Sequence, residues 1–443
     1  MAESQVNEVA LKYMVDDKAV EQSNRYKAYP EYKDSGVEWL GEIPSGWKFS
    51  KLKRTCNVKG GYAFKSELFS DSGIPVIRIG DIHRDGSIDL SGCKYIPIVS
   101  SLVHKEYSIT NGQILMAMTG ATIGKAGRYY NLEPALINQR VGKFELNNQN
   151  ILYSFLWYIL QTDIYRNYIT LTAFGGAQPN ISDVEMVDIH VTIPTKEEQE
   201  SIANFLDYET AKIDTLIEKQ QRLIKLLTEK RQAVISHAVT KGLNPDVPMK
   251  DSGVEWLGKV PAHWEVGRLK NVLRIRNGRD YKAVEVESGG YPVYGSGGVF
   301  RRSSKYLFDG ESVLFGRKGT IDKPLLVSGK FWTVDTMFYS EAFKNAKPEY
   351  IHHQAILFPF DMLSTNTALP SMTQEDLLEL GFVVPPLSEQ VDICQYLKTK
   401  LETFSELTSK AQQAIQLMQE RRTALISAAV TGKIDVRDWE MYN

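Results

Sequence analysis

The sequence predicts a mixed α/β protein in which two similar globules are separated by two long antiparallel coiled-coil helices, with an internal pseudo-twofold repeat. Three observations support this fold class. The chain has 443 residues, which is more than one hydrophobic core usually organises, one segment occurs twice, and two long stretches lack glycine and proline. Hydrophobic residues make up 43% and charged residues 24%, which is typical of globular proteins and argues against disordered, collagenous or membrane-spanning chains.

The repeat is exact at the start of each unit. The segment Lys33-Asp34-Ser35-Gly36-Val37-Glu38-Trp39-Leu40-Gly41 recurs letter for letter 217 residues later, and the spacing shortens to 191 residues at the Glu-Gln pairs 198–199 and 389–390. A period of about 200 residues indicates a domain duplication, because solenoid repeats recur every 20 to 50 residues. The two units are similar in sequence at their ends and dissimilar in their interiors. This pattern favours two copies that keep one assembly surface and carry different recognition surfaces. Neutral drift of loops after an old duplication is the alternative.

The interior of each unit predicts an α/β globule. Short runs rich in Val, Ile, Tyr and Phe, separated by Gly, Asn, Asp and Pro, predict strands at 75–79, 113–118, 136–144, 291–294, 312–315 and 331–339. Residues 151–165 and 350–357 predict helices that pack on these strands. Glycine-rich loops connect the elements.

The ends of the units predict two long helices. Residues 196–240 and 387–431 contain neither Gly nor Pro, and apolar residues recur every seven positions, as at Leu206, Ile213 and Leu227. Proline precedes each stretch and glycine follows it at 242 and 432, which are typical start and stop signals. The two helices are expected to pair with each other. Their wide apolar stripe would leave surface for helices of a partner, with solvated ends as the alternative.

Charge is distributed unevenly although the net charge is only -2. Residues 51–145 carry 13 basic against 8 acidic side chains, and residues 268–330 carry 13 against 6. The two corresponding segments are therefore both basic, as expected for surfaces that meet an anionic partner.

Motifs for catalysis are missing. Gly120-Ala121-Thr122-Ile123-Gly124-Lys125 is too short for a phosphate loop, 174–176 and 294–298 do not match dinucleotide or methyl-donor glycine patterns, and Pro385-Pro386 lacks the flanking residues of a methyltransferase base pocket. His352-His353, without Cys, Asp or Glu at ligand spacing, is more typical of a helix surface than of a metal site. The sequence offers no nucleophile and base grouping either.

The cysteines and the N-terminus suggest a location. Three widely spaced cysteines exclude a disulfide framework and a Cys-rich zinc module, which favours a reducing cytoplasm. Residues 1–25 contain no apolar signal region, and no stretch reaches the ~18 apolar residues of a membrane span.

Polar and basic residues at Gly-rich turns and strand ends form the candidate DNA-binding set. Arg pairs bidentately with guanine, Asn and Gln pair with adenine, and Lys and Thr contact phosphate, so these residue types suit DNA reading; a solvated surface charge is the alternative for each one. In the first unit the set is Lys59, Tyr62, Lys65, Arg78, Thr119, Thr122, Lys125, Asn138, Gln139 and Arg140. In the second unit it is Arg274, Arg276, Asn277, Arg279, Tyr281, Lys282, Arg301, Arg302, Arg317, Lys318, Thr320 and Lys323.

From about Tyr32 to Asp438 the sequence resembles the specificity subunit of type I restriction-modification enzymes. The matching features are the duplicated Ser-Gly-Val-Glu-Trp-Leu-Gly with the Pro-x-x-Trp that follows it, the Pro-x-x-Glu-Gln helix start at 386–390 (194–199 has one extra residue), and the closing Glu-Lys-Arg and Glu-Arg-Arg at 229–231 and 420–422. The resemblance implies an N-terminal extension of unknown role (1–30), target-recognition domains at 31–193 and 242–384, and long helices at 194–241 and 385–443, the second with a C-terminal tail.

The resemblance also implies partners. Each domain would read one half of a bipartite site on double-stranded DNA, while the helices set the spacing and dock two methyltransferase subunits. Restriction (translocase/nuclease) subunits would join through the complex, and S-adenosylmethionine, ATP and Mg would be used on partner chains. Docking is expected at Trp39, Leu40, Trp256, Leu257, Leu223, Leu227, Ala414 and Met418. A non-catalytic scaffold or ligand-binding duplication and a self-contained DNA-modifying enzyme remain as alternatives.

Overall fold

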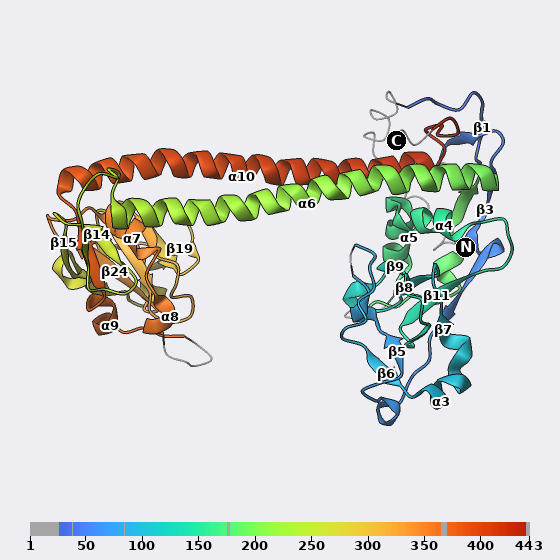
Figure 1. Cartoon of the computed structure of the whole chain (residues 1–443), viewed down its shortest axis with the longest axis horizontal. Helices are drawn as coiled ribbons and strands as arrows, with labels where there is room; N and C mark the ends of the chain where they lie inside the picture. The colour runs from blue at the N-terminus through green and yellow to red at the C-terminus, as the bar shows by residue number, and fades with distance from the viewer. Residues whose placement is uncertain (1–25, 38, 84, 175–177, 365–369, 440–443) are drawn as a thin grey trace. The chain divides into compact units, whose positions relative to one another are not determined.

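The computed structural model describes residues 26–443 except 38, 84, 175–177, 365–369 and 440–443. Most of the predicted N-terminal extension, the glycines at 175–176 and the end of the C-terminal tail therefore lie outside the described residues. The chain divides into two compact units, Met1–Lys219 with Ala414–Asn443, and Gln220–Gln413. Each unit thus contains one globule, one half of the first long helix and the opposite half of the second (Figure 1).

The first unit is built on two four-stranded sheets, ordered β6-β5-β10-β7 and β4-β11-β8-β9, and two strand pairs, β1-β2 and β12-β3. Its strands are β1 (Tyr32–Asp34), β2 (Glu42–Pro44), β3 (Lys48–Lys51), β4 (Cys56–Gly60), β5 (Ile74–Ile77), β6 (Lys94–Ile96), β7 (Ser108–Ile109), β8 (Ile114–Ala117), β9 (Ala126–Arg128), β10 (Ala135–Ile137), β11 (Val141–Leu146) and β12 (His190–Ile193). Its helices are α3 (Ile98–Ser101), α4 (Tyr153–Gln161), α5 (Asp163–Thr172) and the 3-10 turns η2 (Leu52–Arg54), η3 (Ser66–Leu68), η4 (Ile79–Asp81), η5 (Leu102–Tyr107), η6 (Gly120–Thr122) and η7 (Glu185–Val187).

The second unit contains sheets ordered β16-β24-β21-β22 and β17-β19-β18-β23-β20, with strand pairs β13-β14 and β15-β25. Its strands are β13 (Met249–Asp251), β14 (Lys259–Pro261), β15 (Glu265–Arg268), β16 (Leu273–Asn277), β17 (Glu285–Val286), β18 (Tyr291–Gly295), β19 (Gly298–Ser303), β20 (Phe308–Asp309), β21 (Ser312–Gly316), β22 (Leu325–Val327), β23 (Lys330–Thr333), β24 (Met337–Ala342) and β25 (Gly381–Val384). Its helices are α7 (Pro348–Ala355), α8 (Phe360–Leu363), α9 (Gln374–Leu378), η8 (Leu269–Asn271) and η9 (Lys282–Val284).

The two units share the topology of one four-stranded sheet, as the internal repeat predicts, whereas the other sheet has four strands in the first unit and five in the second. Strands β4, β11, β8 and β9 correspond in order to β16, β24, β21 and β22. Both units also contain one parallel strand pair, β10 with β5 and β23 with β18. The strand pairs β1-β2 and β13-β14 have the same register, since Asp34 pairs with Glu42 and Asp251 pairs with Lys259. The duplication is therefore one of whole folded units.

Two long helices, α6 (Lys196–Lys241) and α10 (Leu387–Val430), confirm the prediction from the heptads. The heptad stripe faces the cores: Leu206 and Ile213 pack with Leu425 in the core of the first unit, and the half-buried Val234 packs against the core cluster that contains Leu397 in the second. Within each unit, opposite halves of α6 and α10 lie side by side (Figure 1). Gly242 and Gly432 follow the helices with φ of 76° and 74°, the left-handed conformation that ends many helices.

Three predicted elements are divided in the structure. The predicted strand 136–144 is two strands with a turn at 138–140, and 331–339 is likewise interrupted at 334–336. The predicted helix 151–165 ends at Gln161 because Thr162 is extended, with ψ of 146°, and its hydroxyl accepts the Tyr165 N–H to begin α5. None of these breaks contains Gly or Pro, so the usual punctuation was absent from the sequence.

Among the described residues, every helix is too short or too polar to cross a bilayer. Cys56, Cys93 and Cys394 are all buried free thiols.

Candidate nucleic-acid interface

The candidate interface begins at a glycine that directly follows a strand in each unit, Gly61 after β4 and Gly278 after β16. The Gly61 N–H donates to the carbonyl of Val141 at 2.9 Å, and the Gly278 N–H donates to that of Met337 at 2.9 Å. A Cβ on Gly61 would lie 2.2 Å from the Ile137 carbonyl oxygen, and one on Gly278 would lie 1.9 Å from the Val334 carbonyl oxygen. Only glycine allows this approach of two backbones.

A second pair of contacts brings another segment to the same edge. The Gly120 N–H donates to the Pro179 carbonyl at 2.8 Å, and the Gly319 N–H donates to the Pro370 carbonyl at 2.9 Å. In the second unit the Arg317 N–H also donates to the Thr336 carbonyl. Three loops and one strand end therefore meet in each globule, held by backbone hydrogen bonds that do not depend on side-chain identity.

The side chains on this common backbone differ between the units. Tyr62 follows Gly61, whereas Arg279 follows Gly278. The position after β8 holds Met118, and the equivalent position after β21 holds Arg317. The structure thus brings Tyr62, Asn138 and Gln139 together in the first unit, since Tyr62 bridges Asn138 and the Gln139 N–H donates to the Tyr62 carbonyl at 3.0 Å. Thr119 bridges Asn180 instead.

An aromatic cluster that the sequence did not single out surrounds Tyr62. The ring centroids of Tyr62 and His104 lie 4.2 Å apart, those of Tyr62 and Phe64 lie 5.1 Å apart, and Tyr107 completes the group at 5.4 Å from Tyr62. The Lys59 ammonium lies over the Tyr107 ring. Because these residues come from separate loops, no sequence period marks them.

The predicted basic residues of the first unit fall into two groups. Lys59 pairs with Glu106 at 2.8 Å, which raises the pKa of the lysine, and Arg78 donates to the Gly92 carbonyl at 2.9 Å and lies 3.6 Å from Asp81. The Lys59–Glu106 pair is exposed and contributes about 0–1 kcal/mol, so a phosphate can replace Glu106, whereas Asp81 is buried. Within the described part of the chain, Lys65, Lys125 and Arg140 form no ion pair. Thr122 and Lys125 lie in the η6 loop, and Lys125 also lines a hollow with Trp157 and Arg166.

In the second unit a hollow of about 270 Å³ opens on the common edge. It is lined by Asn277, Arg317, Lys318, Phe338, Ser371, Met372, Thr373 and Gln374. The Arg317 guanidinium lies 5.9 Å from the centre of the Phe338 ring, and its Nη1 donates to the Asp335 carbonyl at 3.4 Å. Asn277 Oδ1 accepts from Gln374 Nε2 at 2.9 Å. Gln374 is a polar member of this site that the sequence analysis missed; the paired prolines 179 and 370 were the signal that its segment joins the edge.

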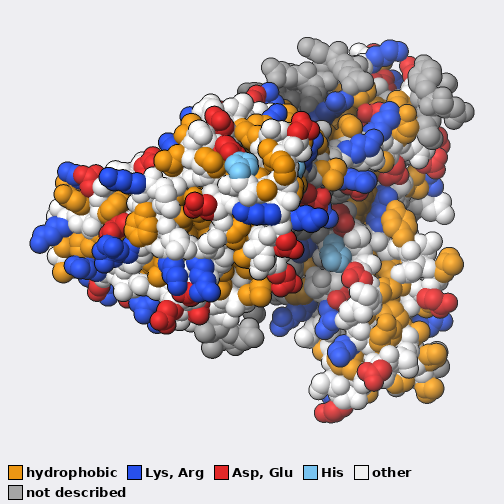
Figure 2. All heavy atoms as spheres, turned by 60° about the vertical axis from the view of Figure 1, so that its left-hand side comes forward, with side chains coloured by type: hydrophobic (Ala, Val, Ile, Leu, Met, Phe, Trp, Pro, Cys, Tyr) orange, Lys and Arg blue, Asp and Glu red, His pale blue; other side chains and the backbone are white. Residues whose placement is uncertain are grey.

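A second basic group lies on the β17-β19-β18 side of the same globule. Lys282, Arg301 and Arg302 line an open hollow with Phe300, and the Phe300 ring packs edge-on against Tyr281 at 5.3 Å. Arg301 pairs with Glu285 at 3.1 Å, and Arg302 donates to the Gly290 carbonyl. Figure 2 shows basic side chains interspersed with acidic and apolar ones on the face of this unit turned to the viewer.

The remaining predicted residues of the second unit are scattered around these two groups. Arg276 pairs with Glu341 at 3.1 Å, and Arg274 lies over the Phe343 ring. Arg279, Thr320 and Lys323 are exposed. The structure therefore places part of the predicted set in two hollows and part in ordinary surface contacts.

Half of the eight predicted docking residues are buried within this chain. Trp39, Leu40, Leu227 and Leu257 are buried within this chain, Trp256, Ala414 and Met418 are half-buried, and Leu223 is exposed. The Trp39 segment packs on Ile43 and Ile164, so its repetition reflects a shared core contact. The apolar surface that remains open on α6 is formed by Leu216, Leu223 and Leu226.

The repeated Pro-x-x-Trp motif packs against the start of each long helix and is hydrogen-bonded to it. Trp47 Nε1 donates to Glu198 at 3.1 Å, and Trp264 Nε1 donates to Glu389 at 2.9 Å. Gln199 Nε2 donates to the carbonyls of Pro194 and Asn150, and Gln390 Nε2 donates to those of Pro385 and Asn345. The Pro-x-x-Trp and Glu-Gln motifs are therefore halves of one buried joint.

Comparison with known proteins agrees with this architecture. The family described as type I restriction modification DNA specificity domain matches twice, at residues 44–226 and 261–417. The chain belongs to this family. It carries two DNA specificity domains of a type I restriction-modification system, which confirms the resemblance read from the repeated motifs.

Relatives and solved structures span both units. The chain is 23% identical to a putative type I restriction enzyme specificity subunit, MjaX, of Methanocaldococcus jannaschii, over 90% of this chain and 96% of that protein. It is 22% identical to the EcoKI specificity subunit of Escherichia coli strain K12, over 91% and 92%. A third match, to the MjaVIII specificity subunit of Methanocaldococcus jannaschii, covers only 49% of that relative.

The fold is also that of solved relatives. A chain from a structure of a type I restriction-modification system superposes with a TM-score of 0.65 at 16% identity, over 88% of this chain and 99% of that one. The HsdS subunit from Thermoanaerobacter tengcongensis gives 0.52 at 15% identity, over 88% and 98%.

Proposed function

We propose that each globule reads one half of a bipartite site on double-stranded DNA and that the chain itself performs no catalysis. The observation that supports this is the common edge, where identical backbone contacts around Gly61 and Gly278 present different side chains. Two globules that share backbone contacts but carry different side chains suit a DNA site made of two different half-sequences.

The second unit has the sharper chemistry for base contact. Arg317 can pair bidentately with the O6 and N7 of guanine, and the amides of Asn277 and Gln374 can present donor and acceptor to adenine. Lys318, on the same hollow, is placed for a phosphate. In the first unit, Asn138, Gln139 and Arg140 at the turn between β10 and β11 supply the corresponding groups, beside the aromatic cluster of Tyr62.

Catalysis belongs on partner chains under this proposal. Methyltransferase subunits would use S-adenosylmethionine to methylate adenine, and restriction subunits would use ATP and Mg to cleave, all in the cytoplasm. Two copies of one methyltransferase subunit fit the duplicated long helices, with Leu216, Leu223 and Leu226 of α6 as exposed apolar contacts.

Selection from random DNA tests the reading function. The chain and its methyltransferase subunit are incubated with a randomised duplex library at rising salt, and bound sequences are determined. A motif of two fixed halves around an unread gap is expected, with affinity that falls as salt rises because phosphate contacts release counterions. Recovery of no motif, or methylation by the chain without its partner, contradicts the proposal.

Docking is tested separately by native mass spectrometry. Two methyltransferase subunits per chain are expected at saturation, and Leu223→Glu should weaken their binding about tenfold or more. Leu132→Glu is the matched control, because Leu132 is an exposed leucine of the first globule at 96% exposure. A single partner at saturation, or equal effects of both variants, contradicts the docking surface.

A further inference from the structure

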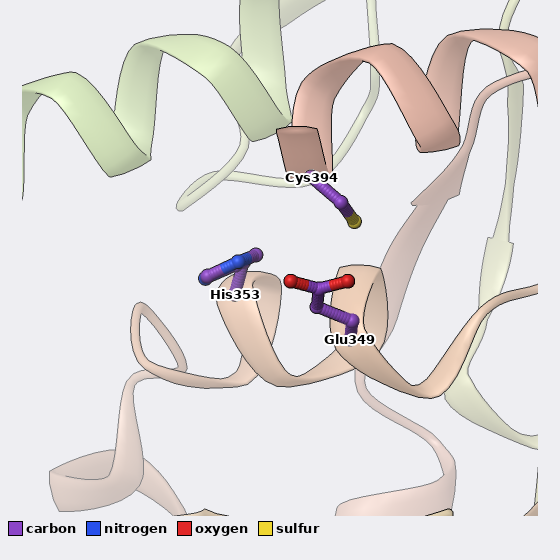
Figure 3. Close-up of side chains that lie close together, drawn as sticks. All are labelled: Glu349, His353 and Cys394. Atoms are coloured by element: carbon purple, nitrogen blue, oxygen red, sulfur yellow. The ribbon is translucent and has the colours of Figure 1, made fainter. Parts of the chain in front are cut away.

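A buried cluster in the second unit is not explained by DNA reading. Glu349 and His353 lie one turn apart on α7, and Cys394 faces them from the start of α10 (Figure 3). One ligand atom of each residue lies within 4.8 Å of the others. The prediction that His352 and His353 are a helix-surface feature is wrong for His353, which is only 6% exposed.

The imidazole of His353 lacks the contacts that a buried histidine normally has. Within the part of the chain that the structure describes, neither Nδ1 nor Nε2 has a hydrogen-bond partner. A buried polar group without a partner destabilises the folded state, so such a group calls for an explanation such as a bound ion. Burial lowers the pKa of His353 to about 4, which leaves the ring neutral with a free lone pair.

The first unit shows how the same position is filled without such a cluster. The shared joint aligns Asn150 with Asn345 and Gln199 with Gln390, so Ser154, Tyr158 and Ala203 occupy the places of Glu349, His353 and Cys394. There the Tyr158 hydroxyl donates to Asp207 on α6, which ties the globule to its long helix. The second unit has replaced that hydrogen bond with three potential metal ligands.

We propose that Glu349, His353 and Cys394 form a zinc site that ties α7 to the start of α10. Thiolate, imidazole and carboxylate are the ligands that zinc prefers, and a water completes four-coordination. Bonds of about 2.0–2.3 Å in a tetrahedron set ligand atoms roughly 3.5 Å apart, which the side chains reach by a small closure from the 4.8 Å limit. The thiolate and carboxylate balance the charge of the ion.

The site acts on the fold and not on the reaction. Zinc that binds the folded chain stabilises the contact between globule and helix in the second unit only, since the first unit has no equivalent ligands. The proposal is independent of which bases the globules read.

Cobalt is the direct probe. The full-length chain without a histidine tag is stripped with a chelator and titrated with Co²⁺. One equivalent is expected to bind with a thiolate-to-cobalt charge-transfer band in the near ultraviolet, and Zn²⁺ should displace it. A wild-type chain that shows no such band overturns the proposal without any variant.

Variants assign the ligands. Cys394→Ala should abolish the band, and His353→Gln should lower metal affinity at least about tenfold. Glu349→Gln, at a half-buried position, should weaken binding while keeping the band. Cys93→Ala is the control for a buried thiol in the first unit and should leave the titration unchanged. Loss of the band in Cys93→Ala, or its persistence in Cys394→Ala, contradicts the assignment.

Hydrogen exchange provides a readout on the folded wild type. Zinc is expected to slow amide exchange in α7 and the first turns of α10, with no change in α4. If zinc protects α4 and α7 equally, or protects neither, then zinc does not connect α7 to the start of α10.

Discussion

The two units differ in what they hold constant and what they vary. Buried joints such as Trp47 with Glu198 and Trp264 with Glu389, and the backbone contacts of Gly61 and Gly278, are the same in both. The side chains at these contacts differ: Tyr62 corresponds to Arg279, and the buried Met118 corresponds to the exposed Arg317. Framework and recognition are thus carried by different residues. Equivalent framework substitutions should therefore have equal effects on the stability of their own units, whereas a recognition substitution should affect one half-site alone.

The largest effect is expected at the close backbone approach. Gly61→Ala forces a methyl group against the Ile137 carbonyl and should destabilise the first globule by about 3 kcal/mol, the upper end for overpacking. Gly278→Ala should do the same in the second. Unfolding followed by hydrogen exchange measures each globule separately.

The neighbouring glycine is the matched control. A Cβ on Gly60 meets no atom within 4 Å, so Gly60→Ala should cost far less than Gly61→Ala. Equal losses for the two variants would mean that the close approach does not determine the glycine.

A smaller effect is expected at the helix joint. Trp47→Phe and Trp264→Phe each remove a hydrogen bond to a carboxylate and should destabilise their own unit by about 2 kcal/mol. Double-mutant cycles with Glu198→Gln and Glu389→Gln isolate the pair energy. Similar coupling in both units supports a shared framework, whereas coupling in one unit alone breaks the comparison.

The smallest free-energy change is expected for recognition. Arg317→Met places the residue of the first unit at the equivalent position of the second and should cost about 1–2 kcal/mol of binding, because one guanidinium edge is already bonded to Asp335. Specificity should relax at one half-site only, as measured by selection from random DNA. A uniform loss on every sequence would make Arg317 a phosphate contact.

Sequence patterns predicted the framework well because its causes are local or periodic. The heptads located α6 and α10, and Gly242 and Gly432 marked their ends through a left-handed residue after the helix. The repeat predicted the common topology. The breaks at 138–140 and 334–336 were not predicted, because those turns are stabilised by hydrogen bonds to residues distant in the sequence and contain no Gly or Pro.

The site was less accessible to sequence. The repetition of Trp39-Leu40 predicted a docking surface, but both residues lie in a buried cluster with Ile43. A repeated core contact and a repeated docking surface produce the same pattern in the sequence. Gln374 and His104 reach their neighbours only through tertiary folding. The cluster at His353 was missed because Cys394 lies on another element, more than forty residues further along the chain.

The central claim is that two independent readers are joined by a helix pair that sets their spacing. It is tested by duplicating one heptad in each long helix: residues 213–219 of α6 are repeated after Lys219, and residues 407–413 of α10 are repeated after Gln413. Seven residues add about 10 Å at 1.5 Å per residue while the apolar stripe is kept. The same α6 heptad inserted in the exposed turn after Leu132 leaves both helices unchanged and serves as the control.

Methylation mapping with the partner subunit gives the answer. The gap between the two half-sites should lengthen by about one to three base pairs, at roughly 3.4 Å per step less tilt and bending, with both half-sequences unchanged. The control should keep the original gap. An active double insertion that methylates sites with the original gap would contradict the account.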